Sequence, residues 1–374
     1  MSPRAEPLRI LQVNSAFSGG GADNQTLELA LGLRELGEEV TLAVPAGSAW
    51  EPLVRQHNLP IETFPERSPL RSALIRCLVH VLRARRIQIV HAHQGRDYWP
   101  SIIAARLVGG VRVVVTRHLM TRPAGFSRWF LLSQAEVVAV SRAVEGVCRR
   151  ELRGPARRLH QVYGGINTAR FQTERTEAVW QFRERQGWLA DAVVFGVVGF
   201  FHLPRGKGHL EFLEAAARAR KDFPASRFAI VGSGSMETVL REAIVRLDLG
   251  GCVSLLPFTT DIPLAMSALD VLVHPAVGTE ALSLVILEAL ASGRPIIASR
   301  LDGIPETFNE GKHGLLVPAD NVPALAGAMR TLLASPKLRE RFGAAGPRHV
   351  REKFSRMAMA GRIRQLYQQI CAPA

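Results

Sequence analysis

The sequence has no apolar stretch long enough to cross a membrane. Its longest apolar runs, such as 192–198 and 283–287, fall far short of the roughly 20 residues that a membrane-spanning helix needs. The first residues also lack a long apolar core followed by a small-residue cleavage site, and residues 8–13 are instead typical of a buried strand. We therefore expect a soluble protein located in the cytoplasm.

Cysteine is scarce, and no group of residues has the spacing of a metal site. The four cysteines lie far apart in sequence, without a CxxC pair or a Cys/His cluster. Scattered thiols in a chain of 374 residues are typical of core positions in a reducing compartment. His91 and His93 point to one face of a predicted strand but have no third ligand nearby. We therefore expect structural cysteines and no bound metal.

Lysine is absent from the first 170 residues, which nevertheless carry most of the net charge. They hold 23 arginines and 13 acidic residues, and so contribute +10 of the total of +14. Such a basic excess is typical of proteins that bind nucleic acid, an anionic membrane surface or an anionic substrate. No RNA-binding sheet motif, zinc finger or heptad zipper is present, so we do not expect nucleic acid as a partner.

The arginines are concentrated in residues 67–86 and 149–158. In the first segment, Leu70, Leu74, Leu78 and Val81 recur at helical spacing, and most of the arginines lie on other faces. This pattern predicts an amphipathic basic helix that can rest on anionic lipid headgroups, so Arg67–Arg86 is our candidate membrane-binding segment. An ordinary surface helix in an arginine-rich protein explains the pattern equally well.

Buried-strand patterns alternate with amphipathic helices, which predicts parallel, doubly wound sheets. The expected strands are 9–13, 40–44, 87–92, 111–116 and 135–140, then 193–198, 227–231, 253–256, 271–274 and 295–299. The stretch 168–190 is polar and lacks a buried run, so it reads as a linker between two similar halves. We predict an α/β protein with Rossmann-like domains at 1–167 and 191–352. A C-terminal helix within 353–374 is expected to pack back toward the first domain.

A glycine-rich turn follows the first predicted strand. Gly20 and Gly21 lie between that strand and the helix predicted at 25–36. Glycines at such a turn let backbone amides approach an anion at the start of the helix. This is neither GxGxxG with a later acid nor a GxxxxGK[ST] loop, so on its own a structural tight turn is equally compatible.

Two glutamates, Glu280 and Glu288, bracket seven mostly apolar residues after the strand at 271–274. A charged side chain in an apolar segment such as that around Glu288 needs a partner. If residues 280–288 are helical throughout, the rise between the two glutamates is roughly 12 Å, comparable to the reach from a sugar across a diphosphate to a ribose. We therefore assign Glu280 to sugar hydroxyls and Glu288 to a ribose diol. The amides of Ala281, Leu282 and Ser283 would then face the phosphates.

On spacing alone, two helix-surface glutamates would be the more common explanation, but the surrounding motifs change this. Glu280 and Glu288 resemble the E-x7-E motif of glycosyltransferase family 4, whose members are retaining enzymes of the GT-B fold. The resemblance extends over nearly the whole chain. Its other matches are residues 19–22, 90–93, 116–118, 140–141, 163–171, 198–208, 231–234 and 303–306. Each motif is loose, but their order and spacing together are specific.

The resemblance implies two Rossmann-like domains facing a central cleft, with a UDP- or GDP-sugar held mainly by the second domain and the acceptor docked on the first. Lys207 is the expected cation for the departing diphosphate, with Arg205 beside it. His118 would lie near the donor sugar. The glycines that would lie near the donor are Gly20, Gly21, Gly199 and Gly232. The family needs no cofactor or metal, and it retains configuration without a protein nucleophile.

Three features depart from the family pattern. Phe200 stands where members usually have arginine, and Arg205 is the candidate replacement for that charge. Ala281 replaces the usual glycine after the first glutamate. Gly164 and Asn167 replace the usual asparagine and aspartate at the turn between the halves, which we interpret as structural changes.

Four functions compete. The first is hexosyl transfer to a lipid-linked or cell-envelope glycan intermediate, such as a lipopolysaccharide precursor, by an enzyme peripheral to the inner face of the cytoplasmic membrane. The second is the same chemistry on a small soluble acceptor. The third is a nucleotide-sugar 2-epimerase of the same architecture, and the fourth is a non-enzymatic nucleic-acid-binding protein that uses only the net charge of +14. The E-x7-E motif, together with the family's T-x-H motif matched by Thr116 and His118, favours the first two, while sugar, base and acceptor stay open.

Overall fold

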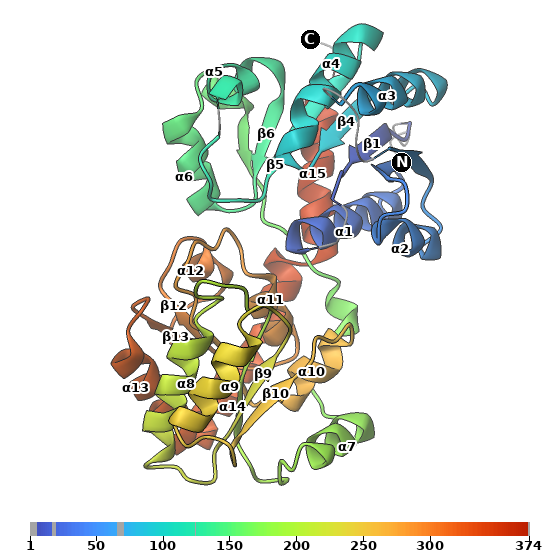
Figure 1. The fold of residues 1–374 in the computed structure, drawn as a ribbon. Coiled ribbons are helices and arrows are strands. Elements are labelled where there is room, and N and C mark those ends of the chain that lie inside the picture. The colour runs from blue at the N-terminus through green and yellow to red at the C-terminus, as the bar shows by residue number, and fades with distance from the viewer. Residues whose placement is uncertain (1–5, 17–19, 66–70, 124, 373–374) are drawn as a thin grey trace. The chain divides into compact units, whose positions relative to one another are not determined.

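A computed structural model describes residues 6–16, 20–65, 71–123 and 125–372 of the chain. The chain divides into two compact α/β units (Figure 1). The first comprises Met1–Ile166 together with Lys353–Ala374, and the second comprises Asn167–Glu352. Each unit is built on one parallel sheet with helices packed against it, as the alternation of strand and helix patterns predicts.

The sheet of the first unit has seven parallel strands in the order β3-β2-β1-β4-β5-β6-β7. The order runs one way from β1 to β3 and the other way from β4 to β7, so the chain switches direction between β1 and β4. In such sheets, ligands bind at the carboxyl ends of the strands beside the switch. The strands are β1 (Arg9–Val13), β2 (Glu39–Pro45), β3 (Ile61–Phe64), β4 (Ile89–Ala92), β5 (Arg112–Arg117), β6 (Glu136–Ala139) and β7 (Leu159–Gln161).

Helices connect these strands, and the last helix of the chain returns to the first unit. The helices are α1 (Gly21–Glu35), α2 (Trp50–Gln56), α3 (Ser72–Ala84), α4 (Tyr98–Val108), α5 (Gly125–Gln134), α6 (Arg142–Glu151) and α15 (Arg356–Cys371). Helix α15 packs against α1, where Arg356 Nε donates to Glu28 Oε2 at 2.5 Å. A Cβ on Gly32 would lie 2.7 Å from that of Ala360, so the glycine permits this close packing.

The sheet of the second unit has six parallel strands in the order β10-β9-β8-β11-β12-β13. They are β8 (Val194–Val198), β9 (Arg227–Val231), β10 (Val253–Leu256), β11 (Val271–His274), β12 (Ile296–Ser299) and β13 (Gly314–Val317). The helices are α7 (Glu177–Arg185), α8 (His209–Arg220), α9 (Glu237–Arg246), α10 (Ile262–Ala268), α11 (Leu284–Ala291), α12 (Ile304–Thr307), α13 (Val322–Ala334) and α14 (Pro336–Lys353). Adjacent β8 and β11 again mark the point where the strand order reverses.

All ten expected strands are present, with bounds that differ by at most two residues at either end. The predictions omitted the short strands β3, β7 and β13, and they named no helix at α2, α4, α5, α6, α12 or α14. Helix α14 contains Gly343, Gly346 and Pro347, residues that usually indicate a loop. Close packing explains the two glycines. A Cβ on Gly343 would lie 2.3 Å from Gly293 O, and a Cβ on Gly346 would lie 2.6 Å from Leu290 O.

The residues expected to form a linker, 168–190, belong to the second unit. Their helix α7 contacts α10, and its Arg183 is completely buried. Arg183 Nη1 donates to Asp270 Oδ2 at 3.2 Å and to Ala268 O at 2.6 Å. Arg175 Nη2 donates to the other oxygen of Asp270 at 2.7 Å. A polar stretch therefore packs here through arginine side chains instead of a buried apolar run.

The basic helix of the membrane hypothesis, α3, turns its apolar face into the protein. Leu74, Leu78, Val81 and Leu82 are buried, and α3 packs on α4 and β3. That face is therefore not available to lipid, and this part of the hypothesis is wrong. Residues 66–70 at the start of the segment lie outside the described residues. Within the described part of the chain, no helix is both long and apolar enough to cross a membrane.

Replacing Asp270 should destabilise the second unit. Asp270→Ala leaves the buried Arg183 guanidinium without its counter-charge, and breaking such a pair costs about 3–5 kcal/mol. Denaturant unfolding followed by circular dichroism measures this change. The control Glu237→Ala removes an exposed pair with Arg241 and should cost about 0.5 kcal/mol or less. Equal stability of the two variants would contradict the structural role of Asp270.

Candidate functional site

The carboxyl ends of the adjacent strands β8 and β11 bring two of the predicted residues together. The loop after β8 carries Lys207, and the loop after β11 carries Glu280. Lys207 Nζ donates to Glu280 Oε2 at 3.0 Å. The Lys207 side chain is 39% exposed, whereas that of Glu280 is 14% exposed. The pair is therefore accessible to a ligand from the lysine side.

Glu280 is held at its main chain as well as at its carboxylate. Its amide donates to Asp302 Oδ2 at 3.1 Å, and its carbonyl accepts from the amide of Gly303 at 3.0 Å. The buried ring of His274, the last residue of β11, places Nε2 3.4 Å from Glu280 Oε2. A carboxylate fixed at both backbone and side chain keeps one geometry, as a ligand-positioning group requires.

The site fixes the charge of Glu280. Burial raises the pKa of Glu280, but the His274 ring and the positive charge of Lys207 outweigh burial and hold it at about 2. Burial lowers the pKa of His274 against the opposing effect of Glu280, so the ring is neutral at pH 7. The Lys207–Glu280 pair therefore carries one positive and one negative charge at neutral pH, and the two balance until an anion approaches Lys207.

Glycines let several loops approach closely at this edge. Gly208, at φ 80°, faces Pro275, and a Cβ there would lie 1.9 Å from the Pro275 carbonyl oxygen. A Cβ on Gly232 would lie 2.1 Å from Gly199 O, so these two predicted donor-site glycines pack against each other. Gly303 is packed in the same way on Ala281 O. Substituting Gly208 or Gly232 would displace the loop that carries Lys207.

The segment between the two glutamates is helical only in its second half. Helix α11 begins at Leu284 and is capped by the backbone of Ser283, so Ala281 and Leu282 precede it. The helical rise of about 12 Å from Glu280 to Glu288 is therefore wrong, because the first four residues form a loop. The amides without helical partners are those of the first helical turn, from Leu284 on. Glu288 lies within α11 and is half-buried.

Arg205 is paired with two carboxylates. Its guanidinium donates to Glu211 and, at 2.6 Å, to Asp320 Oδ1. These bonds raise the pKa of Arg205, and the two carboxylates offset its positive charge. This argues against the expectation that Arg205 supplies the charge of the missing family arginine. Phe200 at that position instead stacks on Phe258, with ring centroids 5.3 Å apart. An exposed aromatic pair therefore lies two residues past the ends of β8 and β10.

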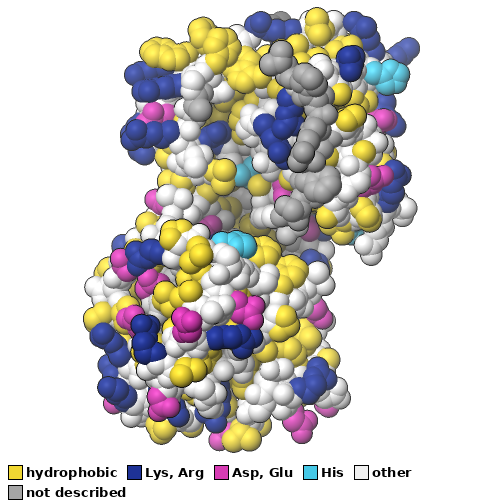
Figure 2. Space-filling view, viewed as in Figure 1, with side chains coloured by type: hydrophobic (Ala, Val, Ile, Leu, Met, Phe, Trp, Pro, Cys, Tyr) yellow, Lys and Arg dark blue, Asp and Glu magenta, His cyan; other side chains and the backbone are white. Residues whose placement is uncertain are grey.

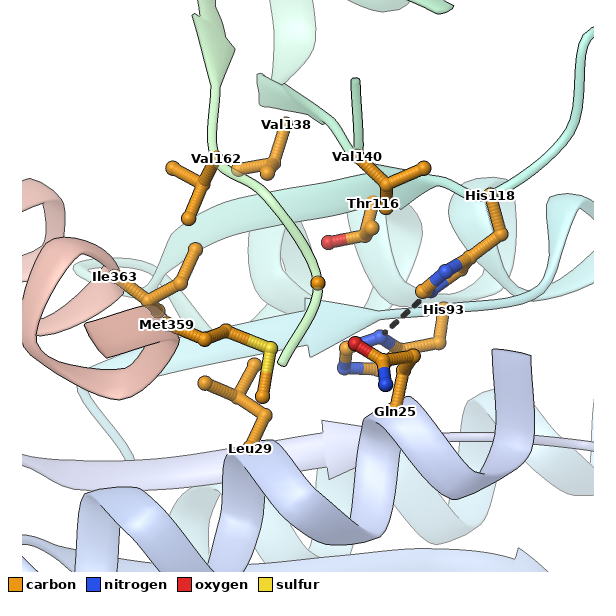
Figure 3. A pocket seen from close by; sticks show the side chains of 11 residues that line it. Gln25, Leu29, His93, Thr116, His118, Val138, Val140, Val162, Met359 and Ile363 are labelled. Carbon is orange, nitrogen blue, oxygen red and sulfur yellow. Dashed lines mark hydrogen bonds between the residues drawn. The ribbon is translucent and has the colours of Figure 1, made fainter. Parts of the chain in front are cut away.

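His118 lies at the carboxyl edge of the first unit, after β5, in a chain of imidazoles (Figure 3). His93 Nε2 lies 2.9 Å from Gln12 Oε1, so that nitrogen carries the proton. His93 Nδ1 therefore accepts from His118 Nε2 at 3.3 Å. Burial, then Arg117, lowers the pKa of His118 to about 4. The ring is neutral at pH 7, and its Nδ1 is a hydrogen-bond acceptor.

His93 and His118 line a small cavity of about 20 Å³ in the first unit, room for one water molecule (Figure 3). His91 does not reach it, because its two nitrogens lie 2.5 Å from Tyr367 Oη and 2.6 Å from Thr116 Oγ1. His91 is thus structural. Among the described residues, no group of three His, Cys, Asp or Glu side chains has the arrangement of a metal site.

The glycine-rich turn of the first unit forms a helix start. Gly20 is the residue before α1 and Gly21 is its first residue, while Gly19 lies outside the described residues. Asp23, in the first turn, accepts from Asn14 Nδ2 at 3.0 Å and from Gln94 Nε2 at 2.9 Å. These contacts fix the turn that follows β1. The amides of the first residues of α1 therefore lie at the edge of the sheet.

Sequence reasoning missed His274 and Asp302. Both lie beside Glu280, although His274 precedes it by six residues and Asp302 follows it by 22. The available signal was the His-Pro pair at the end of a predicted strand, which is an unusual end for a buried run. Nothing in the local sequence distinguishes Asp302 from a turn aspartate.

Comparisons with known proteins agree with this architecture. A family model described as "Glycosyltransferase Family 4" matches residues 19–170, and one described as "Glycosyl transferases group 1" matches residues 192–335. A GDP-mannose-dependent alpha-(1-6)-phosphatidylinositol monomannoside mannosyltransferase of Mycolicibacterium smegmatis is 30% identical over 90% of this chain and 84% of its own length. The chain belongs to glycosyltransferase family 4. It is therefore a glycosyltransferase, and the 2-epimerase alternative is not supported.

Other relatives cover this glycosyltransferase almost end to end. A phosphatidyl-myo-inositol mannosyltransferase of Mycobacterium leprae is 26% identical over 94% of this chain and 93% of its own. A D-inositol 3-phosphate glycosyltransferase of Pseudarthrobacter chlorophenolicus is 29% identical over 87% of this chain and 85% of its own. The Rickettsia africae glycosyltransferase structure covers 99% of this chain and all of its own, at 20% identity and a TM-score of 0.88. Anabaena HepE in complex with UDP covers 97% and 100%, at 22% identity and 0.84.

The charge of Glu280 gives a pH-dependent prediction. The folded protein holds the pKa of Glu280 at about 2 against a usual value of 4.5. The ionised carboxylate therefore stabilises the fold above pH 4.5, and this contribution is lost as the pH falls toward 2. Glu280→Gln should lower the free energy of unfolding by about 1–3 kcal/mol at pH 7, and by less at about pH 3.5. Urea unfolding at both values measures it, and a pH-independent difference would contradict the assignment.

Proposed function

We propose that this glycosyltransferase transfers a hexosyl unit from a nucleoside-diphosphate sugar with retention of configuration, and that its second unit holds the donor. The Lys207–Glu280 pair at the carboxyl edge of the sheet supports this most strongly. It combines an accessible cation for the diphosphate with a fixed carboxylate for sugar hydroxyls. The start of α11 follows four residues later and adds backbone donors at the positive end of a helix.

The chemistry needs charge stabilisation at the leaving group. When the glycosidic bond to the diphosphate breaks, negative charge develops on the phosphate oxygens. Lys207 is positioned to exchange part of its contact with Glu280 for such an oxygen, because its side chain is 39% exposed. A donor aimed at developing charge in a partly desolvated site contributes typically 10²–10³-fold to the rate.

Retention is proposed without a protein nucleophile. Glu280 is the carboxylate nearest the proposed sugar position, but its low pKa and its bond to Lys207 make it a weak nucleophile. The acceptor hydroxyl then attacks the anomeric carbon of the sugar from the same face as that from which the leaving group departs. In this scheme Glu280 orients the sugar, and the departing phosphate takes the proton of the acceptor hydroxyl.

Other roles follow from the family resemblance. Glu288 binds the ribose diol, and the first-turn amides of α11 bind phosphate. From the first unit, His118 accepts a hydrogen bond from a sugar hydroxyl at Nδ1, a role that its neutral state permits. Gly20 and Gly21 contribute backbone amides to the diphosphate. Phe200 and Phe258 offer a stacking surface where the family usually has arginine.

The acceptor is proposed to be a lipid-linked or cell-envelope glycan intermediate. Two of the relatives are named for phosphatidylinositol-based acceptors, and the first unit carries the arginine excess. The second candidate is a small soluble acceptor, which the D-inositol 3-phosphate glycosyltransferase relative favours. The donor is a UDP- or GDP-sugar, because a relative is GDP-mannose-dependent and a neighbour structure contains UDP.

A thermal-shift panel of UDP, GDP, ADP and their common sugars tests the donor proposal. A bound nucleotide sugar raises the melting temperature by mass action, and one base should do so at the lowest concentration. Glu288→Ala should weaken the binding of that nucleotide about 10–100-fold, because a hydrogen bond to a charged group is lost. The control Glu352→Ala removes an exposed glutamate of α14 and should change nothing. Unchanged binding by Glu288→Ala would remove its ribose role.

A further inference from the structure

The first unit exposes a contiguous apolar surface on α4 and α5. Three aromatic side chains of α5 are largely exposed: Phe126 by 61%, Trp129 by 57% and Phe130 by 45%. On α4, Leu107 is 60% exposed and Ile103 41%. Figure 2 shows hydrophobic side chains gathered at the upper left, where Figure 1 places α5. Within α5, the only buried side chains are those of Leu131 and Leu132.

Direct contacts join the two helices into one surface. The Trp99 ring, in the first turn of α4, lies 4.7 Å from the Phe126 ring, and Trp99 Nε1 donates to Ser127 Oγ at 2.9 Å. Phe126 in turn lies 4.4 Å from Phe130. Ile103 and Leu107 follow Trp99 at intervals of four residues, so they continue one stripe of α4. We call these residues the aromatic face: Trp99, Ile103, Leu107, Phe126, Trp129 and Phe130.

Such a surface calls for an explanation. Single exposed apolar residues are normal, but contiguous patches of large apolar side chains mark interaction sites. Aromatic rings are among the residues that gain most from removal from water. The family resemblance assigned no role to this segment, and no predicted site residue lies on α4 or α5.

Arginines surround the aromatic face. Arg83 Nη2, from α3, donates to Leu107 O at 3.3 Å, and the Arg153 guanidinium lies 6.0 Å from the Trp129 ring centroid. Arg106 donates to Gln134 at the end of α5. Arg122 and Arg128 share Glu151 as an ion partner. Arg122 Nε lies 3.4 Å from Glu151 Oε1, and Arg128 Nη2 lies 3.7 Å from Glu151 Oε2. Five arginines thus border the face with one acid among their described ion partners, so the surface complements an anionic plane.

We propose that the aromatic face docks this enzyme on an anionic lipid surface. Tryptophan is enriched at membrane interfaces, where its ring lies among acyl chains and its N–H meets the headgroups. Arginine side chains reach from an apolar contact to phosphate groups in the same plane. The sequence assigned lipid binding to the apolar face of α3, which is buried. In this proposal α3 contributes only Arg83 to the border. The docking is independent of which donor the second unit holds.

Vesicle flotation tests the docking with the full-length protein. Phosphatidylcholine vesicles with and without about 30% phosphatidylglycerol serve as probes. We expect binding to the anionic vesicles only. A triple variant, Phe126→Ser/Trp129→Ser/Phe130→Ser, should reduce the partition coefficient about tenfold or more. Its matched control, Leu189→Ser/Val245→Ser, removes side chains that are 66% and 78% exposed on the second unit, and should bind like the wild type.

The arginine border is tested separately. Arg122→Gln/Arg128→Gln should weaken binding to anionic vesicles, and high salt should weaken the wild type similarly. Arg241→Gln/Arg348→Gln, with 63% and 85% exposed side chains on α9 and α14, is the charge-matched control and should bind like the wild type. Equal binding by the triple variant and the wild type overturns the proposal.

Two further readouts exclude other occupants. Acyl-brominated lipid should quench wild-type tryptophan fluorescence, and Trp129→Phe should reduce this quenching while keeping the fold, with the remainder coming from Trp99. Sedimentation velocity without lipid should show the same mass for the wild type and the triple variant. If the wild type is a dimer that the triple variant dissociates, and vesicles do not bind, the aromatic face joins two copies and the lipid proposal is wrong.

Discussion

The contact between Lys207 and Glu280 is the constraint on which the candidate donor site depends. It joins loops after two adjacent strands, β8 and β11, at the point where the strand order of the sheet reverses. The approach is possible because Gly208 lies against Pro275, where no side chain fits. The same pair sets the local charge, since the positive charge of Lys207 helps to keep Glu280 ionised. Fold, packing and charge thus converge on one cation that an anionic leaving group can use.

The two units use one architecture in different ways. The second pairs Arg175 and Arg183 with Asp270 at the amino ends of its strands, and its Lys207–Glu280 pair lies at the carboxyl edge. The first buries neutral histidines at its carboxyl edge, and carries exposed arginines beside exposed aromatic rings. Family membership makes the chain a glycosyltransferase, and the lipid-docking proposal rests on the exposed aromatic and arginine side chains of the first unit.

Much of the fold was predictable because strands of parallel sheets are buried on both faces and read as apolar runs. This holds for β11, whose bounds were predicted correctly. The site was less accessible. Lys207 and Glu280 are 73 residues apart, and only the family resemblance could associate them. Arg205 was assigned to phosphate because its partner Asp320 lies 115 residues away. The apolar face of α3 was assigned to lipid because an amphipathic pattern cannot distinguish a protein neighbour from a membrane.

The most direct measurement is a crystal structure of the protein with the nucleoside diphosphate that binds best. The account predicts that Lys207 Nζ lies within hydrogen-bonding distance of a phosphate oxygen, with Glu280 still held by Asp302 and Gly303. It also predicts that the ribose lies at Glu288. A nucleotide bound at another edge of the second unit, with Lys207 bonded only to Glu280, would contradict it.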